Sequence, residues 1–211
     1  MIQARPFHAI ALTIVLLITG AAAQKSEPVT VDYFPLRVGD SWTYRSTSGG
    51  TDYKRRVLRE EKQVDGTTRY LVETSMGTRI QAVFSKVNGW VLMHAERYPD
   101  QERLEPEYEP AKKYLPNPLV TGTQWRGDGK DPTQPERQEN NQVMGFERIT
   151  VPAGHFQAMK VVSHVTGGSN GMTETCWYAD GVGLVKQATE DGQKQSTWEL
   201  TDYSFKKKGR K

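Results

Sequence analysis

Hydrophobic and polar residues alternate over most of the chain after residue 40, and residues that favour turns interrupt the alternation. A period of two is typical of β-strands that bury one face. Three pairs of such segments are separated by Asp65-Gly66, Asn88-Gly89 and Asp191-Gly192, and these dipeptides favour the tight turn of a hairpin. A fourth pair flanks the loop 167–171. The paired segments are 53–64 with 67–75, 80–87 with 90–96, 155–166 with 172–179, and 183–190 with 193–205.

Four hairpins in series predict an antiparallel meander, because neighbours in sequence usually pair in space. No segment has the pattern of a long helix, since Pro106 and Pro110 interrupt the best candidate, 101–114. We interpret 97–119 as a long connection and 127–140 as a second polar loop. About eleven strands are more than a flat open sheet holds easily. The predicted fold is therefore all-β: a single curved antiparallel meander sheet or half-open barrel with long loops and little helix.

Curling of such a sheet buries one face, and the alternation indicates which residues point inward. Large aromatic side chains in alternating strands are usually part of a core. The residues expected to be buried are Trp42, Tyr44, Trp90, Leu92, Phe156, Val162, Trp177, Leu184, Trp198 and Leu200.

The first 23 residues have the three parts of a secretory signal peptide. Arg5 gives a positive start, an apolar run covers 9–20, and Ala21 to Ala23 supplies the small residues of a cleavage site. The run is shorter than the ~20 apolar residues of a membrane span. We expect a signal peptide (1–23), a single β domain (24–205) and a basic tail (206–211). The protein is then exported, periplasmic or extracellular, and soluble after cleavage following Ala23.

The positive charge of the chain comes from its C-terminus. The formal net charge is +3, from 28 Lys and Arg against 25 Asp and Glu. Arg5 lies in the leader and five basic residues lie in 206–211, so 22 remain in the predicted domain and its net charge is −3. A nucleic-acid reader carries its basic surface on the folded domain, and we therefore expect no nucleic-acid partner. The tail is a candidate for peripheral contact with an anionic surface.

The residue types that carry most chemistry are sparse. His155 and His164 are nine apart on one predicted strand and so point to opposite faces, whereas His94 and Glu96 share a face but supply only two ligands. The lone Cys176 excludes an internal disulfide, and its position within a predicted strand, opposite 161–162, favours a small buried hydrophobe over a nucleophile. We therefore predict no metal, no cofactor and no catalytic residue.

Three phrases carry a resemblance. They are 33–44 (YFPLRVGDSWTY), 151–156 (VPAGHF) and 177–186 (WYADGVGLVK). Together and in this order they resemble a group of uncharacterised exported bacterial β-rich proteins, distantly similar to the periplasmic lipoprotein-carrier fold, a curved antiparallel sheet open on one side. The resemblance implies a bacterial envelope or secreted location. The helices that fill the concave face of lipoprotein carriers have no counterpart in this sequence.

The favoured function is that of an exported, non-catalytic binding or carrier module for an apolar or lipid-like ligand in the bacterial envelope. A concave, apolar surface with few polar groups is the usual form of a small-molecule site. Candidate ligand-binding residues are Trp90, Trp125 and Trp177, with Tyr108 and Tyr114 as a possible lid.

Two other functions stay open at this point, and the sequence leaves the oligomeric state undetermined. The first is an envelope structural or assembly protein that docks a partner through an edge strand or a loop. The second is a hydrolase that uses loop carboxylates, since glycosidases work with two carboxyl groups across a cleft. The carboxylates considered are Glu60 and Glu61 and, in the proline-rich loop, Glu102, Glu105, Glu107 and Glu109.

Overall fold

The computed structural model describes residues 31–101, 107–127, 136–167, 171–192 and 194–205, and these residues form one sheet of twelve antiparallel strands. The predicted signal peptide and basic tail lie outside the described residues. None of the described residues is helical, so none belongs to a helix that could cross a membrane. The strands are β1 (Ser41–Ser46), β2 (Tyr53–Lys62), β3 (Thr68–Met76), β4 (Thr78–Val87), β5 (Trp90–Arg97), β6 (Glu107–Pro116), β7 (Gln124–Arg126), β8 (Gln138–Val151), β9 (Gly154–Thr166), β10 (Met172–Ala179), β11 (Gly183–Glu190) and β12 (Gln195–Ser204).

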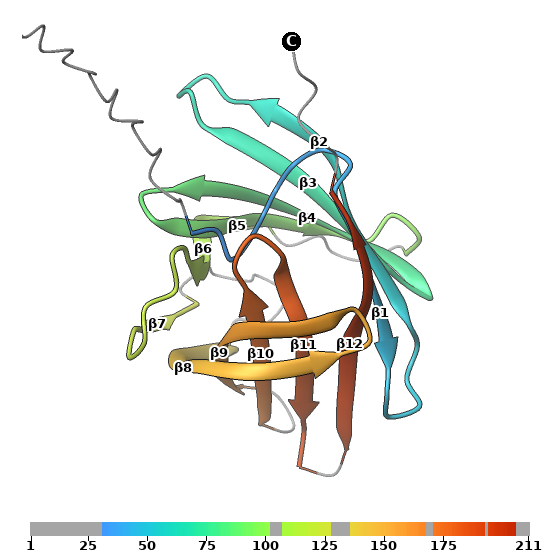
Figure 1. Ribbon diagram of the computed structural model, residues 1–211. Helices are drawn as coiled ribbons and strands as arrows, with labels where there is room; N and C mark the ends of the chain where they lie inside the picture. The colour runs from blue at the N-terminus through green and yellow to red at the C-terminus, as the bar shows by residue number, and fades with distance from the viewer. Residues whose placement is uncertain (1–30, 102–106, 128–135, 168–170, 193, 206–211) are drawn as a thin grey trace, which may run out of the picture. The chain divides into compact units, whose positions relative to one another are not determined.

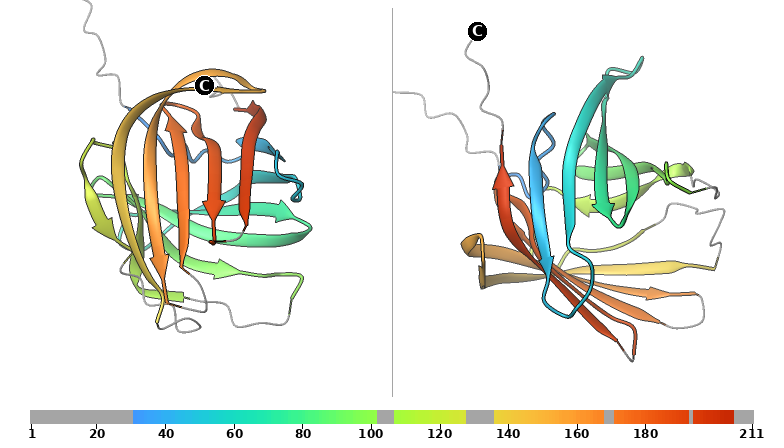
Figure 2. Two further views of the ribbon diagram at one scale, coloured as in Figure 1. Left: turned by 90° about the horizontal axis from the view of Figure 1, so that it is seen from below. Right: turned by 90° about the vertical axis from the view of Figure 1, so that its right-hand side faces the viewer.

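The sheet consists of two meanders, β1–β6 and β7–β12, which are joined in the middle of the sheet by the pairing of β1 with β12. The strand order is β6-β5-β4-β3-β2-β1-β12-β11-β10-β9-β8-β7, so the first strand pairs with the last. Figure 2 shows β1 in blue beside β12 in red. The predicted all-β fold with a curved antiparallel meander is confirmed, and the four predicted hairpins are all present.

The curvature of the sheet follows from its connectivity. The two edge strands, β6 and β7, are consecutive in the chain and only residues 117–123 separate them. Twelve strands at ~4.8 Å spacing would make a flat sheet about 53 Å wide. Seven residues reach about 28 Å even when fully extended. The sheet must therefore curl until its edges approach each other, and Figure 1 shows β6 close to β7 in the nearly closed, barrel-like result.

Side chains, not backbone pairing, join the two edges. β6 pairs only with β5 and β7 only with β8 among the described residues. Lys112 on β6 forms an ion pair with Glu139 on β8 at 2.6 Å, and both side chains are about 85% buried. Trp90 packs edge-on against Trp125, with ring centroids 6.1 Å apart. We call this contact between the two edges the seam.

The segment 97–119 was expected to be a connection, and that prediction is wrong for its second half. Residues 107–116 form β6 despite Pro110 and Pro116. Proline lacks the N–H that a central strand must donate, but it is tolerated at a sheet edge. The second polar loop, predicted over 127–140, is likewise shorter than expected, because residues 138–140 belong to β8.

The inner face of the sheet carries one continuous core, whose fully buried members include Tyr44, Val57, Met159 and Leu200. Trp42 and Leu184 are also buried, as expected, whereas Trp90, Phe156, Trp177 and Trp198 are half-buried against the core.

Two expected core residues, Leu92 and Val162, are only half-buried, and their neighbours Val91, Met93 and Val161 are buried instead. Because successive side chains of a strand point to opposite faces, an assignment that is shifted by one residue exchanges the inner and outer positions.

The segment 31–40 closes one end of the sheet. Its aromatic rings are buried, and Phe34 packs edge-on against Phe84 and Tyr114 at centroid distances of 5.1 and 5.5 Å. In Figure 1 this segment, in dark blue, crosses between the two meanders. We call residues 31–40 the end segment.

Asp32 fixes the end segment to both meanders. Its carboxylate accepts hydrogen bonds from Lys86 Nζ at 2.7 Å and from Asn117 Nδ2 at 2.9 Å on one side. Its backbone N–H donates to Asp180 Oδ1, and its C=O accepts from Gly181 N–H on the other side. Burial opposes ionisation of the carboxyl group, but the hydrogen bond and charge of Lys86 outweigh it and lower the pKa of Asp32.

The substitution Asp32→Ala should destabilise the fold, because it removes the carboxylate that receives Lys86 and Asn117. The side chain is about one-third exposed, so solvent screens part of the ion pair. We expect a loss of about 1–2 kcal/mol in the free energy of unfolding, measured by urea denaturation at pH 7. The wild-type advantage should shrink as the pH falls through the lowered pKa of Asp32, because both states then bind the proton.

Asp202→Ala is the matched control. Asp202 is exposed on β12, and its removal should change the free energy of unfolding by no more than about 0.5 kcal/mol. Equal effects of the two substitutions would contradict the anchoring role of Asp32.

Candidate functional site

A cavity of about 460 Å³ lies on the inner face of the sheet. One wall is mainly apolar and comes from β3, β4 and β5. The opposite wall is polar and comes from β6, β8, β10 and β11. We call this space the inner cavity. The apolar wall is formed by Val72, Met76, Ile80, Ala82, Phe84 and Met93, and the polar wall includes Lys112, Glu139, Glu174 and Gln187.

The polar wall holds two carboxyl groups that have different partners. Glu139 is paired with Lys112 across the seam. Glu174 is half-buried in the wall, and its Oε1 accepts a hydrogen bond from Gln187 Nε2. Burial, with the nearby charge of Glu139, raises the pKa of Glu174. Glu174 is therefore more readily protonated than an ordinary glutamate.

Arg55 lies on the inner face of β2 and reaches into the cavity. Its guanidinium carbon is 4.8 Å from the ring centroid of Phe34 and 5.7 Å from that of Phe84. These distances are typical of cation–π contacts. Arg55 also borders a small gap of about 10 Å³ that it shares with Phe34, Leu36 and Trp42. It therefore stands where the inner cavity meets the packed end segment.

Buried tyrosines surround Arg55. Tyr44 and Tyr53 are stacked, with ring centroids 4.5 Å apart, and the hydroxyl group of Tyr44 donates to Leu184 O at 2.8 Å. Burial raises the pKa of Tyr44 and of Tyr114, while the positive charge of Arg55 acts in the opposite direction on both. The charge of Arg55 therefore acts on both tyrosines.

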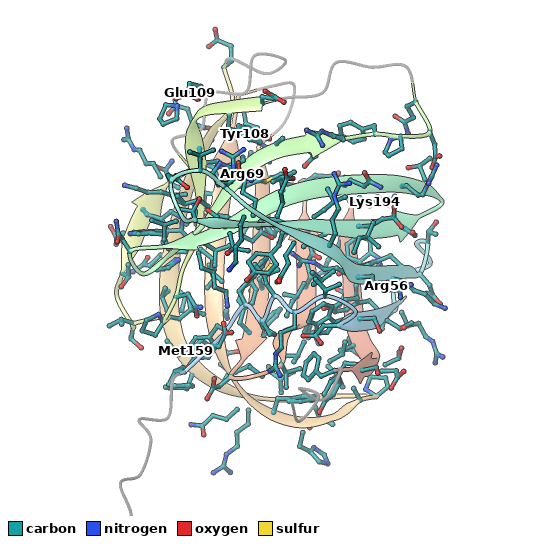
Figure 3. All side chains as sticks on the ribbon, turned by 90° about the horizontal axis from the view of Figure 1, so that it is seen from above. Arg56, Arg69, Tyr108, Glu109, Met159 and Lys194 are labelled. Carbon is teal, nitrogen blue, oxygen red and sulfur yellow. The ribbon has the colours of Figure 1, made fainter. Side chains whose placement is uncertain are left out.

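A second hollow of about 520 Å³ lies outside the sheet over β2–β6. Its lining mixes exposed charges of both signs, including Arg69 and Glu109, and Figure 3 shows these two residues near Tyr108. His94 lies in its wall, and its Nε2 is 2.8 Å from Ser85 Oγ. Burial lowers the pKa of His94, and the charge of Arg69 acts in the same direction. Because its charged groups are largely solvated, this outer hollow is a weaker ligand site than the inner cavity.

The candidate ligand-binding residues fall into three places. Tyr108 and Tyr114 both line the inner cavity, and Tyr114 is a wall residue packed against Phe34 and Phe84, not a mobile cover. Trp90 and Trp125 contact each other at the seam. Trp177 is on the outer face, where its Nε1 donates to Glu147 at 2.7 Å. The structure thus brings the two tyrosines into one cavity and leaves the three tryptophans outside its lining.

The residues that line the cavity most distinctively, Arg55 and Glu174, were missed by sequence reasoning. Each is a single charged residue at an inward position of its strand, Arg55 between Tyr53 and Val57 and Glu174 two residues before Cys176. A charge on the buried side of an alternating pattern was the available signal.

The histidines and Cys176 form no ligand cluster with other residues in the described part of the chain. The prediction that His94 and Glu96 share a face is wrong. β5 has an extra residue between the partners of Val83 and Phe84, and this bulge places His94 in the outer hollow and Glu96 in the inner cavity. Cys176 is buried and pairs with Val161, as expected.

Comparisons with known proteins identify a matching family and two solved structures of similar fold. Residues 95–200, half of the chain, match the model of the DUF3108-like family. A predicted lipoprotein from Parabacteroides distasonis is 16% identical, with a TM-score of 0.52 over 83% of this chain and 99% of its own. A predicted exported protein with a YmcC-like fold from Bacteroides fragilis is 14% identical, with a TM-score of 0.54 over 83% and 100%.

No curated protein matches the chain. At these low identities the two solved structures show a shared fold and nothing further. The resemblance to exported bacterial β-rich proteins that the three sequence phrases indicated is confirmed.

The raised pKa of Glu174 predicts a pH-dependent effect of Glu174→Gln on stability. The folded state binds the proton more tightly than the unfolded chain, so the wild type loses stability as the pH rises above 4.5, the ordinary value. Glutamine is always neutral and can still accept the hydrogen bond from Gln187. We expect equal urea midpoints near pH 4 and a higher midpoint for the variant at pH 8.

Glu190→Gln is the matched control for this effect. Glu190 is exposed at the end of β11, and its backbone partner is Thr173, next to Glu174. Its substitution should leave the pH profile of stability unchanged. A Glu174→Gln variant that is less stable than the wild type at pH 8 would contradict the assignment.

Proposed function

Because the chain belongs to the DUF3108-like family and its fold is shared with one protein described as a lipoprotein and one described as exported, we propose that it is an exported, non-catalytic binding module of the bacterial envelope. Its ligand is a small amphipathic, lipid-like molecule held in the inner cavity. The predicted signal peptide at residues 1–23 supports export. The observation that carries the proposal is the inner cavity, with an apolar wall on one side and a polar wall on the other.

The volume of the inner cavity limits the size of the ligand. About 460 Å³ lies in the range of sites that hold one small molecule, roughly 300–1,000 Å³. A single hydrocarbon chain with a polar head matches this lining, because the chain can lie against β3–β5 while the head contacts polar groups of the cavity. The ligand is therefore a compact amphiphile.

The assembly-protein alternative receives less support from the sheet edges. An edge strand recruits a partner when its N–H and C=O groups are free and accessible. Here β7 is three residues long, β6 contains Pro110 and Pro116, and the two edges face each other across the seam. Docking through the loops stays an alternative, which crosslinking in the envelope would test.

The hydrolase alternative shifts from the loop carboxylates to the inner cavity. Glu107 is mostly exposed and lies 3.9 Å from Arg97, Glu109 is exposed, and Glu102 and Glu105 fall outside the described residues. Glu174, with its raised pKa, is the better candidate for an acid. Glu174 accepts a hydrogen bond from Gln187, and Glu139 is paired with Lys112. Because both carboxyl groups already have partners, they fit a role in a binding site better than a role in catalysis.

Native mass spectrometry of the protein purified gently from the envelope should show an adduct that organic solvent removes. The substitution Ala82→Phe should reduce the adduct fraction, because Ala82 lines the apolar wall and a phenyl ring there fills the cavity. Placing extra side-chain volume in a packed site costs ~1–3 kcal/mol. We expect a similar penalty on ligand binding, and therefore about a tenfold weaker retention of the ligand.

Lys54→Phe is the control, since Lys54 is exposed on the outer face of β2. Both variants should give the circular dichroism spectrum of the wild type. A clean ligand-free mass for the wild type, or equal adducts on all three proteins, would contradict binding in the inner cavity.

A further inference from the structure

Arg55 forms no ion pair with a carboxylate among the described residues. Its observed contacts are the two aromatic rings of Phe34 and Phe84. The nearby acids have other partners: Glu139 pairs with Lys112, and Glu174 accepts from Gln187. Glu96, also in the cavity lining, has an interaction of its own. Arg55 is thus a half-buried cation whose neighbours are rings and tyrosines.

Such a position is unfavourable for an arginine unless an anion completes it. A guanidinium group has five N–H donors and stays charged at all ordinary pH values. A partly buried charge that lacks a partner is destabilising, and contacts with ring faces offset only part of this cost. The same planar group recognises carboxylates and phosphates through two parallel hydrogen bonds.

The aromatic residues below Arg55 hold it in place. Phe34, Phe84 and Tyr114 contact one another edge-on, with centroids 5.1 to 5.5 Å apart. The guanidinium group lies over two of these rings, and Arg55 and Phe84 both line the inner cavity. The ring cluster belongs partly to the end segment, so Arg55 is supported at the closed end of the inner cavity.

We propose that Arg55 is the binding site for the acidic head group of the ligand, which is then an anionic amphiphile with a carboxylate or phosphate head. This inference rests on the proposed function and specifies the class of its ligand. The head lies at the closed end beside Arg55. The hydrocarbon chain extends along the apolar wall past Ala82 and Ile80 toward Met76.

The charges of the polar wall are compatible with an anionic ligand. Lys112 balances Glu139, and Glu174 is readily protonated because burial raises its pKa. Arg137 adds a positive charge to the lining, and Glu96 adds a negative one. The cavity thus favours an anion at Arg55 over a cation at the glutamates.

The test compares four ligands with the same ten-carbon chain: decanoate, decyl phosphate, 1-decanol and decyltrimethylammonium. Dissociation constants are measured by isothermal titration calorimetry below micelle formation, on protein freed of co-purified ligand. We expect one or both acids to bind about ten- to a hundredfold more tightly than the alcohol, as for a charged hydrogen-bonded pair. The tighter of the two acids identifies the head group.

The substitution Arg55→Met should remove the preference for the acids and leave the affinity for 1-decanol within about threefold of the wild type. Arg56→Met is the matched control, because Arg56 is the next residue of β2, is exposed on the outer face and is labelled in Figure 3. It removes the same charge from the protein and should keep the preference. Thermal unfolding checks that both variants are folded.

The possible outcomes separate the two proposals. If 1-decanol binds as tightly as the acids, or if Arg55→Met keeps the preference for acids, the role of Arg55 is overturned while binding in the cavity stands. If the ammonium compound binds best, the glutamates recognise the ligand and the inference is wrong. If none of the four ligands binds the wild type, both the inference and the lipid-like ligand of the proposed function fall.

Discussion

The short connection between the two edge strands is the constraint on which the rest of the structure depends. With the first and last strands paired in the middle, β6 and β7 become the outer strands, and residues 117–123 tie them together. A flat sheet of this width is excluded by the reach of that connection. Curling gives the sheet a concave inner face. It also brings Lys112 on β6 within 2.6 Å of Glu139 on β8, although these strands lie near opposite edges of the sheet.

The inner cavity and the end segment are two results of the same closure. A curled sheet of twelve strands encloses more space than its own side chains fill, and the end segment occupies one end with Phe34 while Asp32 fixes it to both meanders. The remaining space is the inner cavity. Its walls differ in character: β3–β5 supply apolar side chains, whereas β6, β8, β10 and β11 supply Lys112, Glu139, Glu174 and Gln187.

The sequence predicted the strands and hairpins well because their signals are local. Asp65-Gly66 and Asn88-Gly89 are at the hairpin turns, and the alternation around Tyr44 and Leu200 identified buried residues correctly. The bulge in β5 was not predicted. One extra residue at His94 exchanges the inner and outer faces of the rest of the strand. The cavity residues were missed for a related reason: a lone Arg55 or Glu174 gains its meaning only from strands far away in the sequence.

The pairing of β1 with β12 also has a consequence for how the protein folds. All other strand pairs among the described residues join strands that are consecutive in the chain, whereas the Thr201 hydroxyl group on β12 donates to Thr43 O on β1 across 158 positions. Local hairpins close small loops and form quickly, but this pairing closes a very large one, and folding slows as contacts become less local. Each meander can therefore assemble from its own hairpins, and we expect their union, which needs the final strand, to be the slow step of folding.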